Sequence, residues 1–202
     1  MGGHAAGDVA SALVVDSLKR IGPGRSTAQF LSSVKQCLLD ANRELYGRGS
    51  SISPDRTMGA TVVVLVVHET EFFCLWAGDS RLYRFREGRL SQLTHDHRYV
   101  QTLIDAGVLN EAEAENHPRR SAITRAVGVD AELDLDNCEG PIEQGDLFLL
   151  TSDGVTGVCR DEELAAILSA HPIEQAADRI VERCLDAGAP DNLSLILVRA
   201  TS

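Results

Sequence analysis

Apolar side chains recur with helical spacing at the start of the chain. Recurrence at every third or fourth position places side chains on one face of a helix. Residues 5–21 follow this pattern, and the stripe consists of Ala10, Leu13, Val14, Leu18 and Ile21. The segment is therefore predicted to be an amphipathic helix that ends at Gly22-Pro23, since these two residues interrupt helices.

A second apolar stripe follows directly and predicts another long helix. Its members are Phe30, Leu31, Val34, Leu38, Ala41 and Leu45. Ser26 and Gln29 have the spacing of a capping box at its start. Gly47 and Gly49 predict its end, because glycine is the usual residue just beyond a helix C-terminus.

The pattern then changes to short runs rich in β-branched and aromatic residues. These runs are TVVVLVV from Thr61, FFCLWAG from Phe72 and RLYRF from Arg81, with a further short strand around Leu90–Leu93. Such runs separated by brief polar connections predict an antiparallel meander. The first two are almost continuously apolar, which predicts a sheet buried on both faces.

Residues 94–125 are polar and helical in character, and they predict a two-helix insertion interrupted by Gly107 and Pro118. A strand, two helices and a last strand are predicted after it, at residues 146–154, 161–170, 174–187 and 193–199. This order is not the alternation of a parallel α/β sheet. It predicts an α+β fold in which helices cover a mainly antiparallel assembly.

The length and net charge of the chain indicate the number of domains and exclude some kinds of partner. A chain of 202 residues fits one domain, residues 1–202, with a core that needs no disulfide or metal. The net charge of −11 argues against a nucleic-acid partner, which would require a basic surface. We also expect no membrane partner, because the longest apolar run, Ala60–Val67, is too short to span a bilayer and no signal peptide precedes Ala5.

The five cysteines are odd in number and widely spaced, and none forms a CxxC pair. They are interpreted as buried thiols in a reducing compartment, which predicts a cytoplasmic protein.

Three aspartates stand at the ends of predicted strands. Asp79 follows LWAG, Asp153 follows LFLLTS, and Asp191 precedes NLSLILVR. Carboxylates that converge on one edge repel each other unless they share a cation, and Mg²⁺ or Mn²⁺ is the natural partner for oxygen ligands. The alternative is that each aspartate only forms a turn, a role that its side chain favours.

Several ordered motifs resemble one family of enzymes. They are MGGHAAGDVAS, SxxPDRTMGATVVVLVV, WAGDSRLYRFREGRLSQLTHDH, LLTSDGV and GAPDNLSLILVR. In order and approximate spacing they are similar to the metal-dependent serine/threonine protein phosphatases of the protein phosphatase 2C type, in particular the compact bacterial members. The resemblance covers nearly the whole chain.

This resemblance implies an αββα sandwich of two antiparallel sheets flanked by helices, with residues 94–125 as a small helical flap. It implies a phosphomonoesterase for phosphoserine and phosphothreonine in proteins, with two catalytic Mg²⁺ or Mn²⁺ ions that activate a water. By position, Asp153 and Asp191 match ligands of the first catalytic metal. Asp79 matches a ligand of a third, weaker site that Asp153 shares. The implied partners are phosphorylated proteins, the substrates of a bacterial Ser/Thr kinase, and the expected state is a monomer.

The first residues limit this expectation. In the family, MGGH follows an Asp-Gly pair that binds the catalytic metals, and an upstream strand carries a glutamate ligand. We therefore expect the first strand or strands to be missing from this chain. Two hypotheses follow: a phosphatase whose remaining ligands lie upstream, or a catalytically impaired remnant that binds phosphoproteins or regulates them.

Two histidine features complete the candidates. His4 is a candidate for a general acid, because histidine titrates in the useful range; the alternative is a residue that hydrogen-bonds the backbone at the start of a helix. His95-Asp96-His97 has the composition of a metal-binding group, but the interpretation we favour is that it faces solvent or caps the flap helix.

Overall fold

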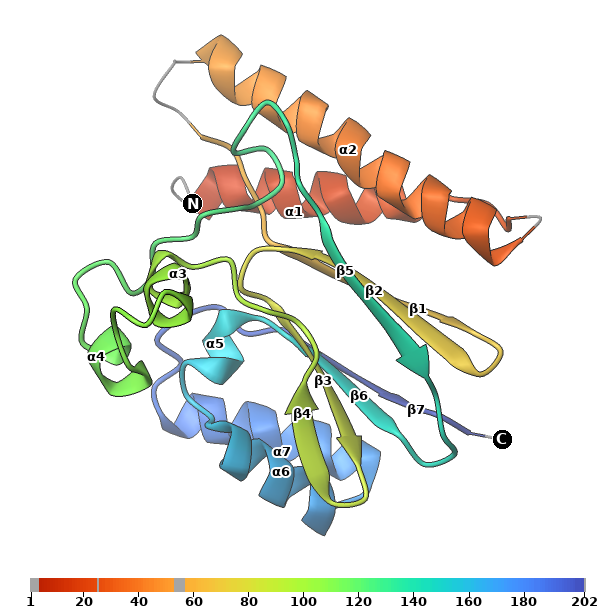
Figure 1. Ribbon diagram of the computed structural model, residues 1–202, viewed down its shortest axis with the longest axis vertical. Helices are drawn as coiled ribbons and strands as arrows, with labels where there is room; N and C mark the ends of the chain where they lie inside the picture. The colour runs from red at the N-terminus through yellow and green to blue at the C-terminus, as the bar shows by residue number, and fades with distance from the viewer. Residues whose placement is uncertain (1–3, 25, 53–56, 202) are drawn as a thin grey trace. The chain divides into compact units, whose positions relative to one another are not determined.

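The computed structural model describes residues 4–24, 26–52 and 57–201, and it begins with two long helices, α1 (His4–Leu18) and α2 (Thr27–Ile52) (Figure 1). Both helices were predicted. The N–H of Gln29 donates a hydrogen bond to Oγ of Ser26 over 3.3 Å, as expected for the capping pair. The predicted end of α2 is wrong, because the helix continues through Gly47 and Gly49. Glycine permits the left-handed conformation that closes a helix but does not impose it.

The predicted early strands are present as β1 (Val62–His68), β2 (Glu71–Ala77), β3 (Arg81–Arg86) and β4 (Arg89–Gln92). They do not form one meander. One sheet has the order β1-β2-β5, and the other has the order β4-β3-β6-β7. The chain therefore changes sheets between β2 and β3. The α+β class, with two antiparallel sheets and accompanying helices, is confirmed.

Strand β5 (Asp136–Pro141) was not predicted. Its sequence, DNCEGP, is polar and contains residues that disfavour strands. Its side chains alternate between half-buried and exposed, and β2 is its neighbour in the sheet. Pairing, rather than propensity, defines this strand. The prediction that β1 is buried on both faces is wrong, because β1 is an edge strand and most of its side chains are only half-buried.

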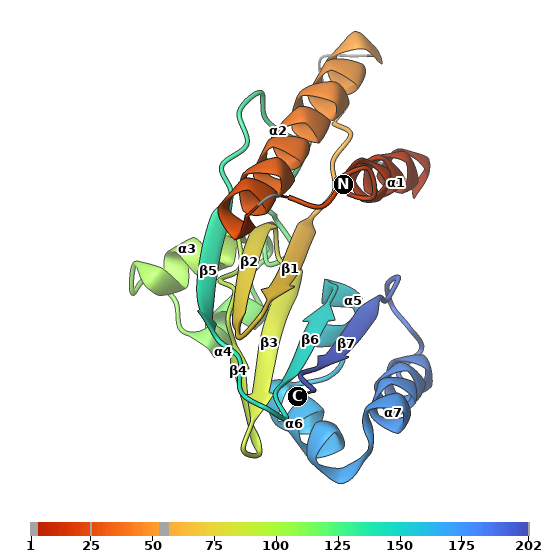
Figure 2. The ribbon, with the colours of Figure 1, turned by 90° about the vertical axis from the view of Figure 1, so that its right-hand side faces the viewer.

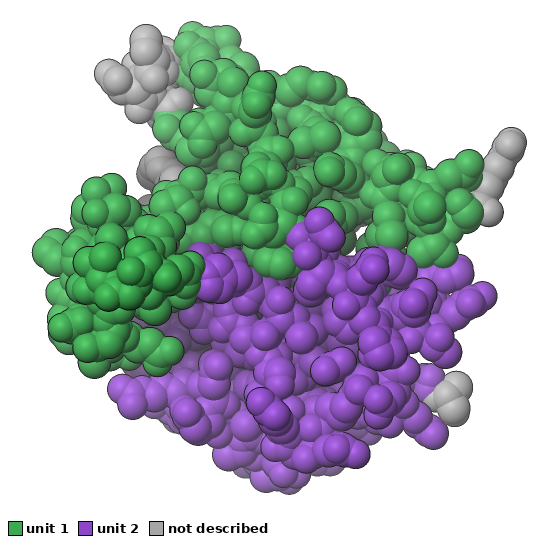
Figure 3. All heavy atoms as spheres, in the orientation of Figure 1, with its two compact units in different colours: residues 1–66, 75–78, 97–136 green, residues 67–74, 79–96, 137–202 purple. Residues whose placement is uncertain are grey.

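Contacts between residues divide the chain into two compact units (Figure 3). Unit 1 consists of residues 1–66, 75–78 and 97–136, and unit 2 consists of residues 67–74, 79–96 and 137–202. In unit 1, α1 and α2 contribute Ala10, Val14, Val34, Leu38, Ala41 and Leu45 to one buried cluster, together with residues of β1 and β2. The two helical stripes of the sequence thus form the core of this unit.

Unit 2 has a core of its own. The elements that build it are β6 (Leu147–Thr151), α5 (Asp153–Thr156), α6 (Asp161–Ala170), α7 (Ile173–Asp186) and β7 (Leu195–Arg199). Figure 2 shows α6 and α7 together on one side of the four-stranded sheet. Strand β6 is buried at every position. The buried thiols of Cys159 and Cys184 lie within this core, with 3.9 Å between their sulfur atoms. The prediction of buried thiols is confirmed for these two and for Cys74, but it is wrong for Cys37 and Cys138, which are only half-buried.

The predicted insertion contains two short helices, α3 (Tyr99–Asp105) and α4 (Glu111–Glu115). Gly107, with φ of 68°, allows the chain to turn between them. A capping box of Asn110 and Glu113 starts α4. None of the helices in the described ranges is long and apolar enough to cross a membrane.

Asn42 on α2 fastens a loop to the core of unit 1. Its side chain is 1% exposed. Nδ2 donates to the carbonyl oxygens of Asp130 and Ala131 over 3.0 and 3.3 Å, and Oδ1 accepts a hydrogen bond of 2.6 Å from the N–H of Gly128. All polar atoms of this buried amide therefore have partners, which is the condition for burying such a group at low cost.

Substitution of Asn42 by alanine is expected to lower the free energy of unfolding by roughly 2–4 kcal/mol, because the loop loses three hydrogen bonds and keeps buried polar groups without partners. Urea unfolding followed by circular dichroism measures this. The exposed Asn137 on β5 is the matched control; its substitution by alanine should change the free energy by less than about 0.5 kcal/mol. Equal losses for both variants would contradict the anchoring role.

Candidate functional site

The register of the four-stranded sheet brings the three predicted aspartates to one edge. The first residues of β3 and β7 both lie opposite Thr151, the last residue of β6, in antiparallel pairs. The chain therefore enters β3 and β7 at the edge where it leaves β6. Asp79 comes two residues before β3, Asp153 two residues after β6, and Asp191 four residues before β7.

The segments that carry Asp153 and Asp191 lie against each other. The N–H of Ser152 donates to the carbonyl oxygen of Ser194, and the N–H of Ser194 donates to Oγ of Ser152, each over 3.0 Å. The Cα of Gly154 lies so close to the following segment that an added Cβ would overlap the carbonyl oxygen of Asn192. Glycine is thus needed here for a close approach of two backbones.

The aspartates differ in exposure. Asp153 and Asp191 are exposed, whereas Asp79 is 7% exposed. Oδ1 of Asp191 accepts a hydrogen bond of 2.7 Å from the N–H of Asn192, the local bond that a turn-forming aspartate makes. This bond uses one of several carboxylate acceptor positions, so it leaves others available.

The donor chemistry of this edge fits Mg²⁺ or Mn²⁺, since both prefer carboxylate oxygens. Across residues 4–24, 26–52 and 57–201, however, no three His, Cys, Asp or Glu side chains form a group that could hold a metal ion. Mg²⁺ keeps several waters and binds through one or two carboxylates in many sites. Asp153 and Asp191 could hold such an ion as a pair.

The remaining catalytic candidate, His4, is the first residue of α1, and its side chain lies outside the described part of the structure. Its role as a general acid stays a prediction.

The favoured interpretation of His95-Asp96-His97 is wrong for two of the three residues. His95 is exposed, but Asp96 and His97 are buried. In unit 2, Nε and Nη2 of Arg81 donate to the two carboxylate oxygens of Asp96, each over 2.8 Å, and the Asp96 side chain is only 2% exposed. This ion pair could not be predicted from local patterns, because Arg81 lies on β3, fifteen positions before Asp96.

A buried tyrosine extends this ion pair. The hydroxyl of Tyr83 accepts a hydrogen bond of 2.7 Å from Nη1 of Arg81 and donates one of 2.9 Å to Asp161, the first residue of α6. Burial raises the pKa of Tyr83 well above its usual value, so the hydroxyl stays protonated and can donate. Arg81, in the GDSR motif, therefore has fixed partners close to where β3 begins.

In unit 1, His97 has partners on both ring nitrogens. Nδ1 accepts a hydrogen bond of 3.0 Å from the N–H of Gly78, and Nε2 lies 3.1 Å from a carboxylate oxygen of Asp136. Nη1 of Arg125 donates to the other oxygen over 2.5 Å. Burial alone would raise the pKa of Asp136, but the bonds from His97 and Arg125 outweigh it and hold the pKa below its usual value.

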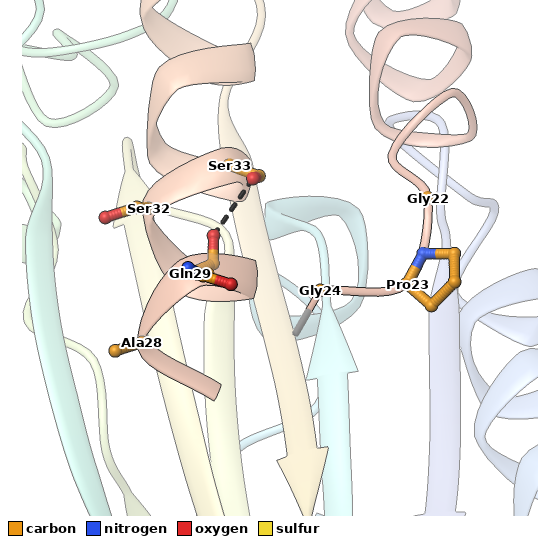
Figure 4. A pocket seen from close by; sticks show the side chains of 7 residues that line it. All are labelled: Gly22, Pro23, Gly24, Ala28, Gln29, Ser32 and Ser33. Carbon is orange, nitrogen blue, oxygen red and sulfur yellow. Dashed lines mark hydrogen bonds between the residues drawn. The ribbon is translucent and has the colours of Figure 1, made fainter. Parts of the chain in front are cut away.

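A shallow hollow of 620 Å³ lies at the turn between α1 and α2 (Figure 4). It is lined by Gly22, Pro23, Gly24, Ala28, Gln29, Ser32 and Ser33. None of the predicted site residues is among them. Because none of these described lining residues has a charged side chain, they do not match the predicted phosphate chemistry.

Comparison with known proteins agrees with the motifs. The family model described as Stage II sporulation protein E (SpoIIE) matches residues 8–201. The serine/threonine phosphatase stp of Listeria monocytogenes serovar 1/2a is 31% identical over 98% of this chain and 81% of its own length. The chain belongs to the SpoIIE/PP2C-type phosphatase family.

Other members of the SpoIIE/PP2C-type family share the fold. The structure of PppA, described as a key regulatory component of T6SS in Pseudomonas aeruginosa, has a TM-score of 0.89 and 39% identity, over 98% of this chain and 82% of that one. The serine/threonine protein phosphatase PstP of Mycobacterium tuberculosis (strain CDC 1551 / Oshkosh) is 34% identical over 98% of this chain. The chain spans only 38% of the length of that relative.

A structure of a PstP catalytic domain in complex with two manganese ions has a TM-score of 0.86 and 30% identity, over 100% of this chain and 85% of that one. A member of the family with a closely similar fold therefore binds Mn²⁺.

Substitution of Gly154 by alanine is expected to separate the segments of Asp153 and Asp191, because the new methyl group would overlap the Asn192 carbonyl. The free energy of unfolding should fall by roughly 2–3 kcal/mol, and the melting temperature should fall by several degrees. Differential scanning calorimetry measures it. Gly47 in α2 has open space around it; its replacement by alanine is the control and should stabilise by up to about 1 kcal/mol.

The pH dependence of stability tests the Asp136 cluster. A carboxyl whose pKa is lowered in the folded state stabilises the protein fully above its unfolded pKa, and this contribution disappears as the pH falls through the folded pKa. The stability difference between the native protein and Asp136→Asn should therefore be constant above about pH 5 and shrink below about pH 4. Urea unfolding across this range measures it. A difference that is as large at about pH 3 as at neutral pH would contradict this account.

Proposed function

We propose that the chain carries out metal-dependent hydrolysis of phosphoserine and phosphothreonine esters in proteins. The observation that carries this proposal is the acidic edge, at which Asp79, Asp153 and Asp191 end or precede three adjacent strands of one sheet. Membership of the SpoIIE/PP2C-type family and the phosphatases among its relatives support the same reaction.

Asp153 and Asp191 would hold the first catalytic Mg²⁺ or Mn²⁺. The exposure of both carboxylates supports this role, because a ligand for a substrate-contacting ion must be reached from solvent. Asp79 would contribute with Asp153 to a third, weaker site. In such a centre the ions supply charge neutralisation at the phosphoryl oxygens and activation of the attacking water.

The protein's own contribution is to hold these carboxylates in place. The paired backbone hydrogen bonds of Ser152 and Ser194 fix the segments of the two exposed ligands. The flap, residues 94–125, would contribute to the choice of phosphoprotein. The substrates of the phosphatase would be proteins that a bacterial Ser/Thr kinase has phosphorylated. The five cysteines are all free thiols, which supports a reducing cytoplasmic location.

A second candidate is a phosphoprotein-binding or regulatory module without catalytic power. One observation favours it: within the described ranges no three ligand side chains form a group that could hold a metal. The expectation that further ligands lie upstream in the family stays a prediction, and the same assay can test it.

Replacement of Asp153 or Asp191 by asparagine is expected to reduce phosphatase activity at least about 100-fold, because each change removes a charged ligand oxygen. The measurement is Mn²⁺-dependent release of phosphate from a phosphothreonine peptide, with p-nitrophenyl phosphate as a second substrate. Asp178, an exposed residue on α7, provides the matched control. Asp178→Asn should keep full activity.

Activity that survives in Asp153→Asn would contradict the proposed role of the acidic edge. If this chain is inactive, the assay is repeated on a form extended by any in-frame upstream codons. Activity gained on extension would support a phosphatase with upstream ligands. Inactivity of both forms, together with retained binding of the phosphopeptide, would favour the binding module.

A further inference from the structure

His97 holds both polar backbone atoms of Gly78. The N–H of Gly78 donates to Nδ1 of the His97 ring, and the N–H of His97 donates to the carbonyl oxygen of Gly78, each over 3.0 Å. The two residues are nineteen positions apart in the sequence. The backbone at the end of β2 is thus fixed by a single residue from the beginning of the flap.

Gly78 has an unusual backbone conformation and directly precedes Asp79. Its φ is 120°, a value that other residues rarely adopt, and the side chain of Thr61 occupies the space that a Cβ would need. Asp79 is the next residue, and it is 7% exposed. The peptide after Gly78 leads directly into Asp79, so its orientation is one of the torsions that set the direction of the Asp79 carboxylate.

The hydrogen bonds also fix the tautomer of His97. Because Nδ1 accepts from Gly78, the proton of the neutral ring is on Nε2, which donates to Asp136 over 3.1 Å. Trp76, the single tryptophan of the chain, stacks on the same ring with an interplanar angle of 16° and 6.2 Å between ring centroids. The two nitrogens therefore have separate tasks: one binds the turn, and the other binds the Asp136–Arg125 pair.

We propose that His97 is a positioning residue whose hold on Gly78 sets the affinity of Asp79 for Mg²⁺ or Mn²⁺. The inference rests on the proposed function, in which Asp79 is a metal ligand. Hydrogen-bond partners of a metal ligand itself affect metal affinity by about 10- to 100-fold, and a residue that fixes the neighbouring peptide is expected to act at the lower end of this range. The flap has a path to this ligand, since the N–H of Thr124 donates to the His97 carbonyl over 2.8 Å.

Two substitutions of His97 each remove one of the two hydrogen bonds that its ring nitrogens make. The side-chain oxygen of asparagine can take the place of Nδ1 as an acceptor, so His97→Asn keeps the bond from Gly78 and loses the one to Asp136. The amide nitrogen of glutamine reaches the position of Nε2, so His97→Gln keeps the bond to Asp136 and loses the one from Gly78. Asp136→Asn leaves the hold on Gly78 in place and serves as a further control.

The experiment is isothermal titration calorimetry of the whole chain with Mg²⁺, with Trp76 emission as an optical readout. His97→Gln and Asp79→Asn should each weaken Mg²⁺ binding on the order of tenfold. His97→Asn and Asp136→Asn should stay within about twofold of the native protein. Melting temperatures are recorded for all variants. A purely structural role would make affinity follow stability, without the difference between asparagine and glutamine at position 97.

Each other result has a defined meaning. If Asp79→Asn weakens binding and His97→Gln does not, the inference is overturned and the proposed function stands. If only Asp153→Asn weakens binding, Asp79 is no ligand, which also overturns the inference but keeps the catalytic pair. If the native chain and all variants bind Mg²⁺ equally or not at all, both the inference and the metal role of the acidic edge fail.

Discussion

The antiparallel pairing of β6 with β3 and β7 is the constraint on which the candidate site depends. Three strands whose ends coincide at Thr151 place three otherwise distant aspartates at one edge. The hydrogen bonds of this sheet act in a fully buried strand, where every backbone group must find a partner. The position of the carboxylates is thus a by-product of forces that act on the core. A slip of register by one residue would turn every side chain of β6 to the opposite face, and it would disrupt both the core and the positions of the carboxylates.

A second principle is that the carboxylates of two described clusters are each paired with an arginine. The Arg81–Asp96 pair is bidentate, and a tyrosine hydroxyl and a glutamine amide satisfy further donors and acceptors. In unit 1, Asp136 binds both a histidine and an arginine. Removing one member of such a pair costs more than the pair contributes, because it leaves its partner uncompensated.

Much of this could be predicted from the sequence, for identifiable reasons. The helices and the apolar strands have strong periodicity or β-branched content, and the acidic edge followed from aspartates at strand ends. Strand β5 could not be predicted, because its polar residues DNCEGP form a strand only through pairing. The burial of Asp96 and His97 could not be predicted, because their partners, Arg81 and Gly78, are distant in sequence. Local sequence patterns indicate secondary-structure propensity and polarity, but they do not identify a hydrogen-bond partner that is distant in the sequence.

The division into two units has a consequence for how the molecule can be made and taken apart. The chain passes through six segments that alternate between the units, so neither unit is a continuous stretch. No single cut in the backbone separates them, and neither can be expressed alone by choosing two end points. During synthesis, unit 2 obtains its last strand, β7, long after its first segment has left the ribosome. The acidic edge is consequently one of the last features to be completed, after the helices of unit 1 have been available for folding.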